Sequence, residues 1–475
     1  MKLNVLSKDE VERLHLAILQ VFEKTGVKVY SRRALEMLKN AGAEVEEKTF
    51  RVKIPSYLVE ECIKNTPKYI HLYSRDSKLQ LKLERDNFYT VLGSTVVNVI
   101  DPETFKRVKG RKEYIAKAAK VVDALPNIHI AAQFCLALDC SPEVQELHEL
   151  EAVFTNTVKP VMAIAYSPQG AKKIIEMAAI IKGGIEKLRK EPLLFMYTEP
   201  TSPLEYSEKA LDTLIETVKL GIPVLSAPCV QAGATGPVSL AGTLVQSFVE
   251  SLTGLILAQL TKKGAPTIIG EVSTVMDMRT GVMSYGAPEF SIINAASSQL
   301  AHYYGIPFFG TGGCSDSKLP DEQAVAEAAT SLFAAMLSGT NLIHDVGYLE
   351  GAMTGSLEMV VIIDELFSMM SRIIKGIKID EETLALNVIN DVGPGGHYLA
   401  HKHTLKLFSE EHWLPSLIDR RRYEFWKVDG EKDMVTRARE KLQKILREHE
   451  PEPLPKEIKQ ELVNIIVKRN RPEVK

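Results

Sequence analysis

Aromatic and acidic residues follow a series of apolar segments along this chain. The residues at the segment ends are Gln133, Tyr166, Tyr197, Glu199, Gln231, Glu271, Asp316, His344, Asp345, Tyr348 and Glu350. Tyrosine rings and carboxylates that converge on one pocket suit a cationic guest, because ring faces and diffuse negative charge hold a quaternary ammonium. The alternative is that single tyrosines among them only pack in the core beneath loops.

Two of these positions could take part directly in a reaction. Glu271 ends an apolar run, where a carboxylate is costly unless it is paired or used. His344 could bind a substrate carboxylate or act as an acid or base, and a structural role in the core is an equally open alternative.

Other patterns indicate metal, phosphate or thiol chemistry only weakly. His397, His401 and His403 include a pair at i and i+4, but no carboxylate or cysteine stands at a matching spacing, so we expect no bound metal. The stretch Gly310-Thr311-Gly312-Gly313 lacks the G-K-S/T sequence of a P-loop, and we expect its glycines to let the backbone approach a bulky ligand. Cys229 and Cys314 have no obvious base nearby in sequence and are expected to be structural thiols.

Prolines mark the elements that would position these residues. Pro126, Pro160, Pro192, Pro223, Pro266 and Pro307 each precede a strand-like stretch. A proline can occupy the first residue of a strand, because its missing N–H costs nothing there. Strands that alternate with helices at this period predict a parallel sheet of βαβ units, with the chemistry at the carboxyl ends of the strands.

The alternation predicts eight strands and eight helices. Strands are expected at 88–94, 128–134, 161–166, 193–198, 224–227, 267–271, 308–311 and 341–345, and helices at 111–124, 142–157, 168–182, 205–220, 239–263, 288–304, 321–338 and 355–374. This count favours an α/β fold of the (β/α)8 TIM-barrel type over a doubly wound sheet, which would be expected to have fewer strands and a Gly-rich first turn. The first strand is open to a second interpretation, because residues 88–100 could form a hairpin outside the barrel.

The chain divides into three regions. We expect an N-terminal mixed α/β cap over residues 1–85, the barrel over 86–375, and a Gly- and His-bearing segment with a C-terminal helical extension over 376–475. Charged amphipathic helices after residue 431 would be solvated or would pack on the barrel.

The composition and net charge limit the binding partners and the cellular compartment that we expect for this protein. A net charge of −3 over 475 residues implies no single-sign field, so nucleic acid is a poor partner. Five cysteines without a C-x-x-C pair fit a reducing cytosol, and we expect a cytoplasmic protein, since the N-terminus lacks an apolar signal core. The apolar stretch 239–260 carries Gln246, Glu250 and Gln259, which favours a buried barrel helix over a membrane span.

Three segments together resemble the trimethylamine methyltransferase family of corrinoid-dependent amine methyltransferases. They are residues 310–329, 338–365 and 391–404, and the similarity runs over essentially the whole chain. The resemblance implies a (β/α)8 barrel, a corrinoid (cobalamin) carried by a separate partner protein, and methyl transfer from an amine to the Co(I) corrinoid. A homo-oligomer is also expected.

The resemblance also implies a substrate class. Relatives that act on trimethylamine carry pyrrolysine in the stretch matching Leu349 to Ala352, at Gly351, where this chain has only standard residues. That departure places the chain with the branch that resembles glycine betaine and other quaternary-amine demethylases. A quaternary ammonium already has a neutral amine as its leaving group, so its demethylation needs positioning and exclusion of water rather than a proton.

On this hypothesis each site residue has a role. Tyr166, Tyr197 and Tyr348 would cage the ammonium, with Glu271 balancing charge, His344 contacting a betaine carboxylate and Gly351 leaving space. Gly310, Gly312 and Gly313 would let the corrinoid approach, and Asp316 would touch the cofactor or its protein. Two alternatives stay open: a metal-dependent barrel hydrolase that uses the His397 region, and a betaine- or osmolyte-binding protein without catalysis.

Overall fold

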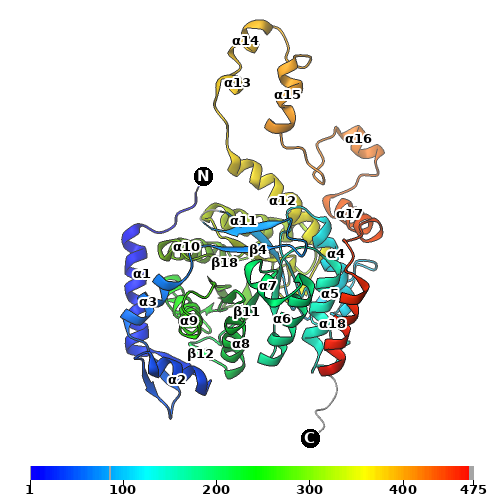
Figure 1. The fold of residues 1–475 in the computed structure, drawn as a ribbon. Coiled ribbons are helices and arrows are strands. Elements are labelled where there is room, and N and C mark those ends of the chain that lie inside the picture. The colour runs from blue at the N-terminus through cyan, green and yellow to red at the C-terminus, as the bar shows by residue number, and fades with distance from the viewer. Residues whose placement is uncertain (1, 85–86, 470–475) are drawn as a thin grey trace.

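Eight parallel strands form a barrel in the computed structural model, which describes residues 2–84 and 87–469 (Figure 1). The strands are β6 (Tyr89–Leu92), β9 (Ala131–Ala132), β10 (Val161–Ile164), β11 (Leu194–Thr198), β13 (Val224–Ser226), β15 (Thr267–Gly270), β18 (Phe308–Thr311) and β19 (Leu342–Val346). Each pairs in parallel with the next around the ring, and a bridge between Val91 and Ile130 joins β6 to β9. The predicted (β/α)8 barrel is confirmed.

Helices alternate with these strands as the sequence predicts. They are α4 (Lys112–Ala124), α5 (Gln145–Asn156), α6 (Pro168–Lys182), α7 (Ile185–Lys190), α8 (Glu208–Lys219), α9 (Leu240–Thr261), α10 (Pro288–Tyr304), α11 (Glu322–Ser338) and α12 (Leu357–Lys375). Within the described residues, α9 alone is long and apolar enough to cross a membrane, but most of it is buried in the protein against α1, α3, α8 and the barrel strands.

The prolines have a clear place in the barrel ladder. The carbonyls of Pro160, Pro223, Pro266 and Pro307 accept hydrogen bonds from Ala131, Met196, Val224 and Ile269 of the preceding strand. A proline at a strand entry therefore completes the ladder through its carbonyl, while its missing N–H leaves no donor unpaired. This is why the proline spacing located the strands.

The N-terminal region packs against one side of the barrel. It contains α1 (Lys8–Gln20), η1 (Val21–Thr25), β1 (Val27–Val29), α2 (Arg32–Asn40), β2 (Glu44–Glu46), β3 (Arg51–Lys53), α3 (Ser56–Asn65), β4 (Ile70–Tyr73) and β5 (Gln80–Leu83). The small sheet of this cap also includes β12 (Glu205–Tyr206) from the barrel region, paired in parallel with β1. The predicted boundary at residues 85 and 86 lies outside the described residues.

Two small sheets lie on the loops at the carboxyl ends of the barrel strands. One contains β7 (Asn98–Ile100), β8 (Arg107–Lys109), β20 (Tyr348–Leu349) and β21 (Thr354–Gly355), and the other β14 (Gln231–Ala232), β16 (Thr274–Asp277) and β17 (Val282–Ser284). The barrel-strand interpretation of residues 88–94 is confirmed, and the hairpin interpretation of 88–100 is wrong, because β6 pairs with β19 whereas β7 pairs with β8 and β21. We call these two sheets the roof of the barrel mouth.

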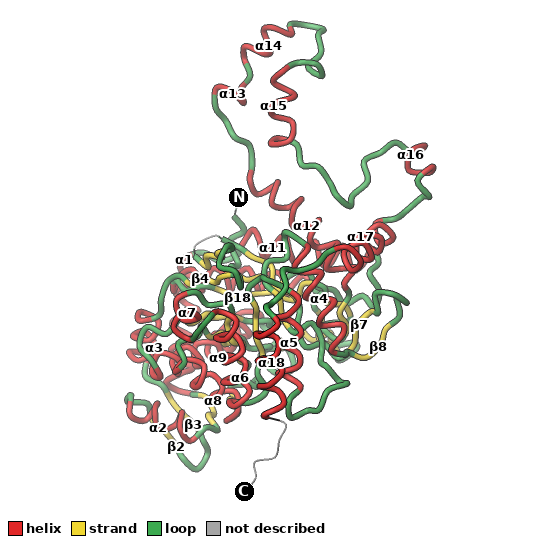
Figure 2. Tube along the Cα trace, turned by 45° about the vertical axis from the view of Figure 1, so that its right-hand side comes forward, coloured by secondary structure: helices red, strands yellow, loops and turns green. Residues whose placement is uncertain are grey.

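An arm formed by residues 376–433 projects from the body after α12 (Figures 1 and 2). It carries the short helices α13 (Glu381–Leu384), α14 (Leu386–Val392), α15 (Lys402–Glu411) and α16 (Tyr423–Val428). Because α12 starts at the mouth and runs along the barrel, the arm leaves near the opposite end. Leu399 keeps 87% and Leu405 76% of its surface exposed, which is unusual for leucine.

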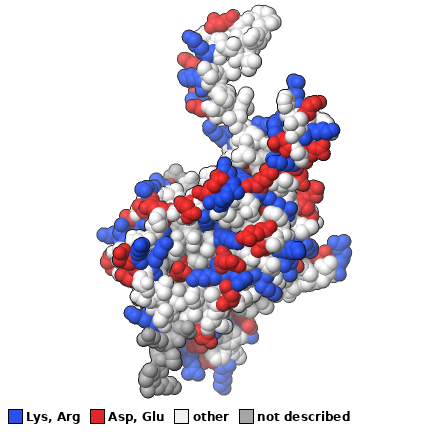
Figure 3. Space-filling view, turned by 90° about the vertical axis from the view of Figure 1, so that its right-hand side faces the viewer, with Lys and Arg blue, Asp and Glu red and all other residues white. Residues whose placement is uncertain are grey.

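The last two helices cover the barrel rather than extend into solvent. α17 (Met434–Glu448) packs on α12 and α4, and α18 (Lys456–Arg469) packs on α6 and α5. At the end of α18, Arg469 forms a 2.9 Å ion pair with the buried Glu146. On the face seen in Figure 3, basic and acidic side chains are interspersed over the body, without a region of one sign.

Candidate active site

A chain of aromatic rings lines the barrel interior near the mouth. Tyr197 of β11 lies 6.0 Å from Phe309 of β18 between ring centroids, and Phe309 lies 5.0 Å from His344 of β19. The His344 ring meets Tyr348 edge-on at 5.8 Å. Side chains from different strands meet here because inward positions of a parallel barrel converge at the carboxyl end.

His344 and Asp345 form the polar centre of this cluster. Asp345 adopts a left-handed backbone (φ 74°), at the irregularity in the pairing of β19 with β6. Its Oδ1 lies 2.7 Å from His344 Nδ1, but the two atoms are not aligned for a hydrogen bond. His344 Nδ1 and Asp345 Oδ2 are thus buried without a hydrogen-bond partner, which is costly unless a ligand or a proton compensates.

The Asp345 charge acts on the groups around it. Burial is the main cause of the raised pKa of each of these groups, and the Asp345 charge adds to it. The groups affected are Tyr197, Glu199, Cys229, Tyr285, Cys314 and Tyr348. Residues from the ends of four barrel strands and from the roof therefore share one electrostatic environment around Asp345.

Glu199 follows the end of β11 at the barrel mouth, beside Tyr197. The residue keeps accessible surface, although protein atoms surround its carboxyl group on most sides. Burial raises the pKa of Glu199 to about 7, with smaller contributions from the charges of Asp345 and Glu250, while the neighbouring Tyr197 hydroxyl lowers it. In the part of the chain that the structure describes, no salt bridge joins Glu199, Glu271 or Asp345 to a lysine or arginine.

Glu271 lies in a recess lined with serines at the end of β15. Its Oε2 accepts a hydrogen bond from the Ser273 backbone N–H at 2.9 Å, and its Oε1 is buried without a partner. Burial raises the pKa of Glu271 to about 7, and Ser273, Ser297 and Ser247 oppose the shift. The carboxyl group therefore lies between β15 and helices α9 and α10, and the catalytic role predicted for it stays a prediction.

This recess makes stability depend on pH. Because the folded-state pKa of Glu271 is about 7, above the unfolded value near 4.5, its contribution is fully present below pH 4.5 and is lost as the pH rises through 7. Between pH 5 and pH 8, we expect the free energy of unfolding to fall by about 2–3 kcal/mol less in Glu271→Gln than in the native protein. Urea unfolding of both proteins at the two pH values measures this, and an equal decrease in both would contradict it.

Tyr166 belongs to a neighbouring network rather than to the aromatic chain. Its hydroxyl donates a 2.8 Å hydrogen bond to Glu149 of α5, which also accepts from Ala137, Gln145 and Gln133. Of the three predicted cage tyrosines, the structure brings Tyr197 and Tyr348 together and places Tyr166 apart. The caging roles of all three stay a prediction.

The glycines at 310–313 are packed inside the wall. A Cβ on Gly310 would lie 1.9 Å from Asn294 Oδ1 of α10, and one on Gly312 would lie 3.0 Å from the Ser331 carbonyl of α11. A Cβ on Gly313 would lie 3.4 Å from Ile363 of α12. Sheet-to-helix packing thus explains these glycines, and the corrinoid contacts predicted for them stay a prediction.

Asp316 and Gly351 lie together in the roof. The Asp316 carboxylate accepts hydrogen bonds from the Tyr285 and Gly286 backbone N–H groups at 2.8 and 3.0 Å, and from Ser284 Oγ. This fastens β17 to the loop after β18. Gly351 has φ 56°, and a Cβ there would have only Met283 O (3.3 Å) and Asp316 Oδ1 (3.6 Å) within 4 Å. The space predicted beside Gly351 is therefore bordered by the roof.

Sequence reasoning missed two members of the cluster. Phe309 alternates inward on β18, and the strand period could have indicated it. Tyr285 follows β17 in the roof, and its pKa is raised by burial and then by the charges of Cys229 and Asp345. Because the roof is an insertion, the βα alternation carried no signal for Tyr285.

The histidines of the arm do not meet in a metal-binding group. His403 contacts the Glu382 carbonyl at 3.1 Å, and His401 Nδ1 accepts from the His403 backbone N–H at 3.1 Å. Across residues 2–84 and 87–469, no group of three or more His, Cys, Asp or Glu residues could hold a metal ion.

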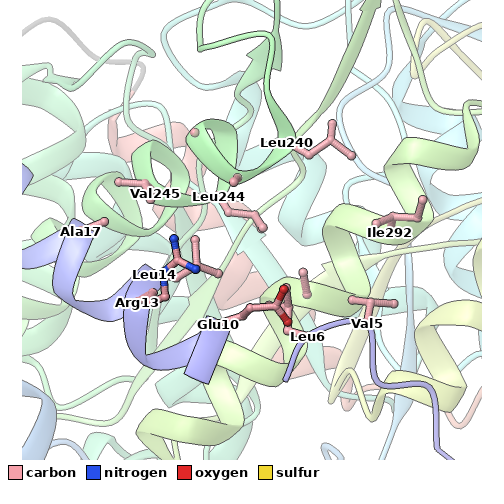
Figure 4. A pocket seen from close by; sticks show the side chains of 13 residues that line it. Val5, Leu6, Glu10, Arg13, Leu14, Ala17, Leu240, Leu244, Val245 and Ile292 are labelled. Atoms are coloured by element: carbon pink, nitrogen blue, oxygen red, sulfur yellow. The ribbon is translucent and has the colours of Figure 1, made fainter. Parts of the chain in front are cut away.

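A separate pocket of about 490 Å³ opens outside the barrel (Figure 4). Its lining is almost wholly apolar and comes from the N-terminal segment, α1, α9 and α10. Of its two charged residues, Glu10 is already hydrogen bonded to the backbone and hydroxyl of Ser7 in a helix cap. The barrel mouth, with several convergent polar groups, is therefore the better candidate for chemistry.

A parallel barrel with buried carboxylates at its mouth defines an α/β-barrel enzyme. A family model described as "Trimethylamine methyltransferase (MTTB)" matches residues 1–473. The chain belongs to this family, and it is a methyltransferase.

Relatives at comparable similarity carry two different names. The chain is 36% identical over 460 residues to "Trimethylamine methyltransferase MttB" of Desulfitobacterium hafniense (strain DSM 10664 / DCB-2), covering 97% of this chain and 92% of that protein. It is 34% identical over 472 residues to "Glycine betaine methyltransferase" of D. hafniense (strain Y51), covering 99% and 98%. The fold is similar to the crystal structure of the Methanosarcina barkeri monomethylamine methyltransferase MtmB, with a TM-score of 0.55 and 14% identity over 94% of this chain and 88% of that one.

Proposed function

We propose that this methyltransferase moves a methyl group from a quaternary amine to the Co(I) corrinoid of a partner protein. The observation that carries the proposal is the acidic and aromatic barrel mouth, where Glu199 and Asp345 have no paired lysine or arginine among the described residues. A buried negative charge without a partner is costly, and a cationic substrate would compensate it.

The residues at the mouth would bind and orient the ammonium group. Faces and edges of Tyr197, Phe309 and Tyr348 would contact its methyl groups, and Asp345 would supply the nearest negative charge. The Tyr348 hydroxyl both accepts from Ser94 N–H at 2.7 Å and donates to the Ser94 carbonyl, so the ring is held in place. Since the leaving amine is neutral, the reaction needs a fixed substrate geometry and a roof that excludes water, and it needs no residue that donates a proton.

A corrinoid at the mouth would act as the methyl acceptor, with Co(I) as the nucleophile. Several large apolar side chains on the mouth loops are exposed: Leu138, Val238, Met278, Val282, Leu319 and Met353. Exposed apolar groups that surround a polar site are typical of a docking surface. We propose that this rim receives the corrinoid protein, with Gly351 and the Asp316 loop beneath it.

A reconstituted assay tests the proposal. The full chain, a corrinoid protein, a reductant that generates Co(I) and a panel of quaternary amines are combined, and the visible spectrum is followed. We expect loss of the Co(I) bands, appearance of methyl-Co(III), and the demethylated amine in equal amount. No spectral change with any amine would overturn the proposal. Calorimetric binding without methyl transfer would favour a non-catalytic binding protein instead.

The arm supports the proposal of a homo-oligomer. Its exposed apolar residues include Ile377, Leu399, Leu405, Phe425 and Val428, and a segment this open has no core of its own to bury them. Since the arm leaves the barrel away from the mouth, we propose that it packs on a second copy of this chain.

Polar substitution on the arm checks the oligomer. We expect the native protein to elute well above the 52.8 kDa of one chain, and the double variant Leu399→Asp, Leu405→Asp to elute near that mass with its circular dichroism unchanged. Tyr57→Asp on α3, also an exposed position, is the matched control and should leave the assembly intact. A native protein that elutes as one chain would contradict the proposal.

A further inference from the structure

The orientation of a substrate in this barrel follows from the site itself. The methyl group must face the open mouth, because the strand entries at the other end are closed by the barrel core. The rest of the substrate must then point inward, toward Glu199, Asp345 and His344. Among the described residues, no lysine or arginine forms a salt bridge with Glu199 or Asp345, so the inner end of the substrate meets two carboxyl groups without a basic partner.

A carboxylate would be poorly placed in this interior. Three basic side chains near the mouth are already engaged: Arg107 pairs with Glu350 at 2.9 Å, Arg279 with Asp277 at 3.1 Å, and Lys318 bonds the Asp316 carbonyl at 2.8 Å. All three lie on the outer loops or roof strands. A substrate with an inward carboxylate would meet Glu199 and Asp345 instead of a cation, and like charges at close range oppose binding.

We infer that the substrate carries a net positive charge, as a quaternary ammonium whose remainder is neutral, and that Glu199 selects it over zwitterions such as betaines. This inference rests on the proposed function and deepens it, because it names the charge class of the substrate. One relative is named for glycine betaine, a zwitterion, so the selection would be specific to the residues of this chain.

The groups that face Glu199 come from several elements. Tyr197 lies on the same strand end, Asp345 follows His344 on β19, and Glu250 faces it from α9. Cys229, after β13, is influenced by Glu199 as well. All of these groups are acidic or neutral, so ionised Glu199 is stabilised chiefly by the cation that binds. With a pKa of about 7, Glu199 would ionise as a cation enters, and cation affinity should rise between pH 6 and pH 8.

Choline and glycine betaine form a matched pair for the test, because a hydroxymethyl group in one replaces a carboxylate in the other. Calorimetry on the full-length chain measures both dissociation constants at pH 6, 7 and 8. We expect choline to bind at least about ten-fold more tightly than glycine betaine at pH 8. In Glu199→Gln the preference should fall to less than about three-fold, chiefly through weaker choline binding, and the pH dependence should flatten.

A control variant and the possible contrary results distinguish failure of this inference from failure of the proposed function. Glu461→Gln removes the same charge on the exposed face of α18 and should leave both constants unchanged. Tighter or equal binding of glycine betaine, or binding of neither compound, would overturn the inference. A preference that persists in Glu199→Gln would overturn the role of Glu199. If methyl-Co(III) forms in the reconstituted assay while glycine betaine is preferred, only this inference fails; if no amine gives methyl-Co(III), the proposed function fails.

Discussion

Replacing Asp345 with asparagine is expected to lower kcat/KM for a quaternary amine by about 100-fold. Asp345 Oδ1 lies 2.7 Å from Nδ1 of His344 in the aromatic chain, and the Asp345 charge acts on Tyr197, Glu199 and Tyr348. Asparagine has almost the same shape, and it tolerates the left-handed backbone (φ 74°) that this position requires. The substitution therefore removes the charge without forcing the chain to move.

Steady-state rates of methyl-corrinoid formation measure this effect. The loss should fall mainly on KM if Asp345 binds the ground-state ammonium, since that interaction is made before the methyl group moves. Asp9→Asn removes an exposed charge on α1 and should leave kcat/KM unchanged. A variant of Asp345 that keeps its activity, with unchanged thermal stability, would show that the cation is held elsewhere.

Replacing Lys159 with methionine is expected to give the largest loss of stability, about 3–5 kcal/mol in the free energy of unfolding. Lys159 Nζ donates hydrogen bonds to the carbonyls of Val122, Leu125 and Ile128 at 2.6, 2.5 and 2.6 Å. These carbonyls lie at the end of α4 and before the next strand, where few backbone donors reach them. Methionine keeps the apolar stem but removes all three short bonds. The Val122 and Leu125 carbonyls then keep only backbone bonds of 3.3 and 3.4 Å, and the Ile128 carbonyl keeps no protein donor among the described residues.

Urea unfolding at fixed pH, followed by circular dichroism, gives this value. Lys64→Met on the exposed face of α3 is a matched control, and it should change the free energy of unfolding by less than about 0.5 kcal/mol. A loss below 1 kcal/mol for Lys159→Met would mean that water or a shift of the backbone satisfies the three carbonyls. Comparison of the two variants separates the loss of three internal hydrogen bonds from the replacement of an exposed lysine.

The barrel was predictable because its signals are local. Prolines mark strand entries, and apolar runs and amphipathic helices recur in a regular order. β9 has only two residues in the regular ladder, and the stretch predicted at 128–134 is otherwise held by side chains and single backbone bonds. The roof sheets are insertions into βα loops and follow no repeat, so their pairing depends on contacts distant in sequence.

The site was predictable only in part, for the same reason. Strand ends located Tyr197, Glu199, His344 and Asp345, since a parallel barrel brings strand ends together. The sequence did not indicate the contacts that Tyr166 and Gly310 make with the outer helices α5 and α10, and the ligand roles of both residues stay predictions. The projection of the arm was also missed, because its short helices follow no repeat and most of their apolar residues stay exposed.

The junction of β9 with β10 has a consequence for motion. Gln133 replaces a missing step of the ladder: its Oε1 accepts from Ile164 N–H at 2.8 Å, and its Nε2 donates to the Ile164 carbonyl at 2.9 Å. A side-chain amide holds two strands less firmly than a continuous ladder. We therefore expect amide hydrogens of residues 131–134 and 164–166 to exchange with solvent faster than those of β11 and β13. Opening of the barrel at this junction would move Tyr166, while Phe309 on β18 and His344 on β19, which are not neighbours of β9 or β10, would stay in place.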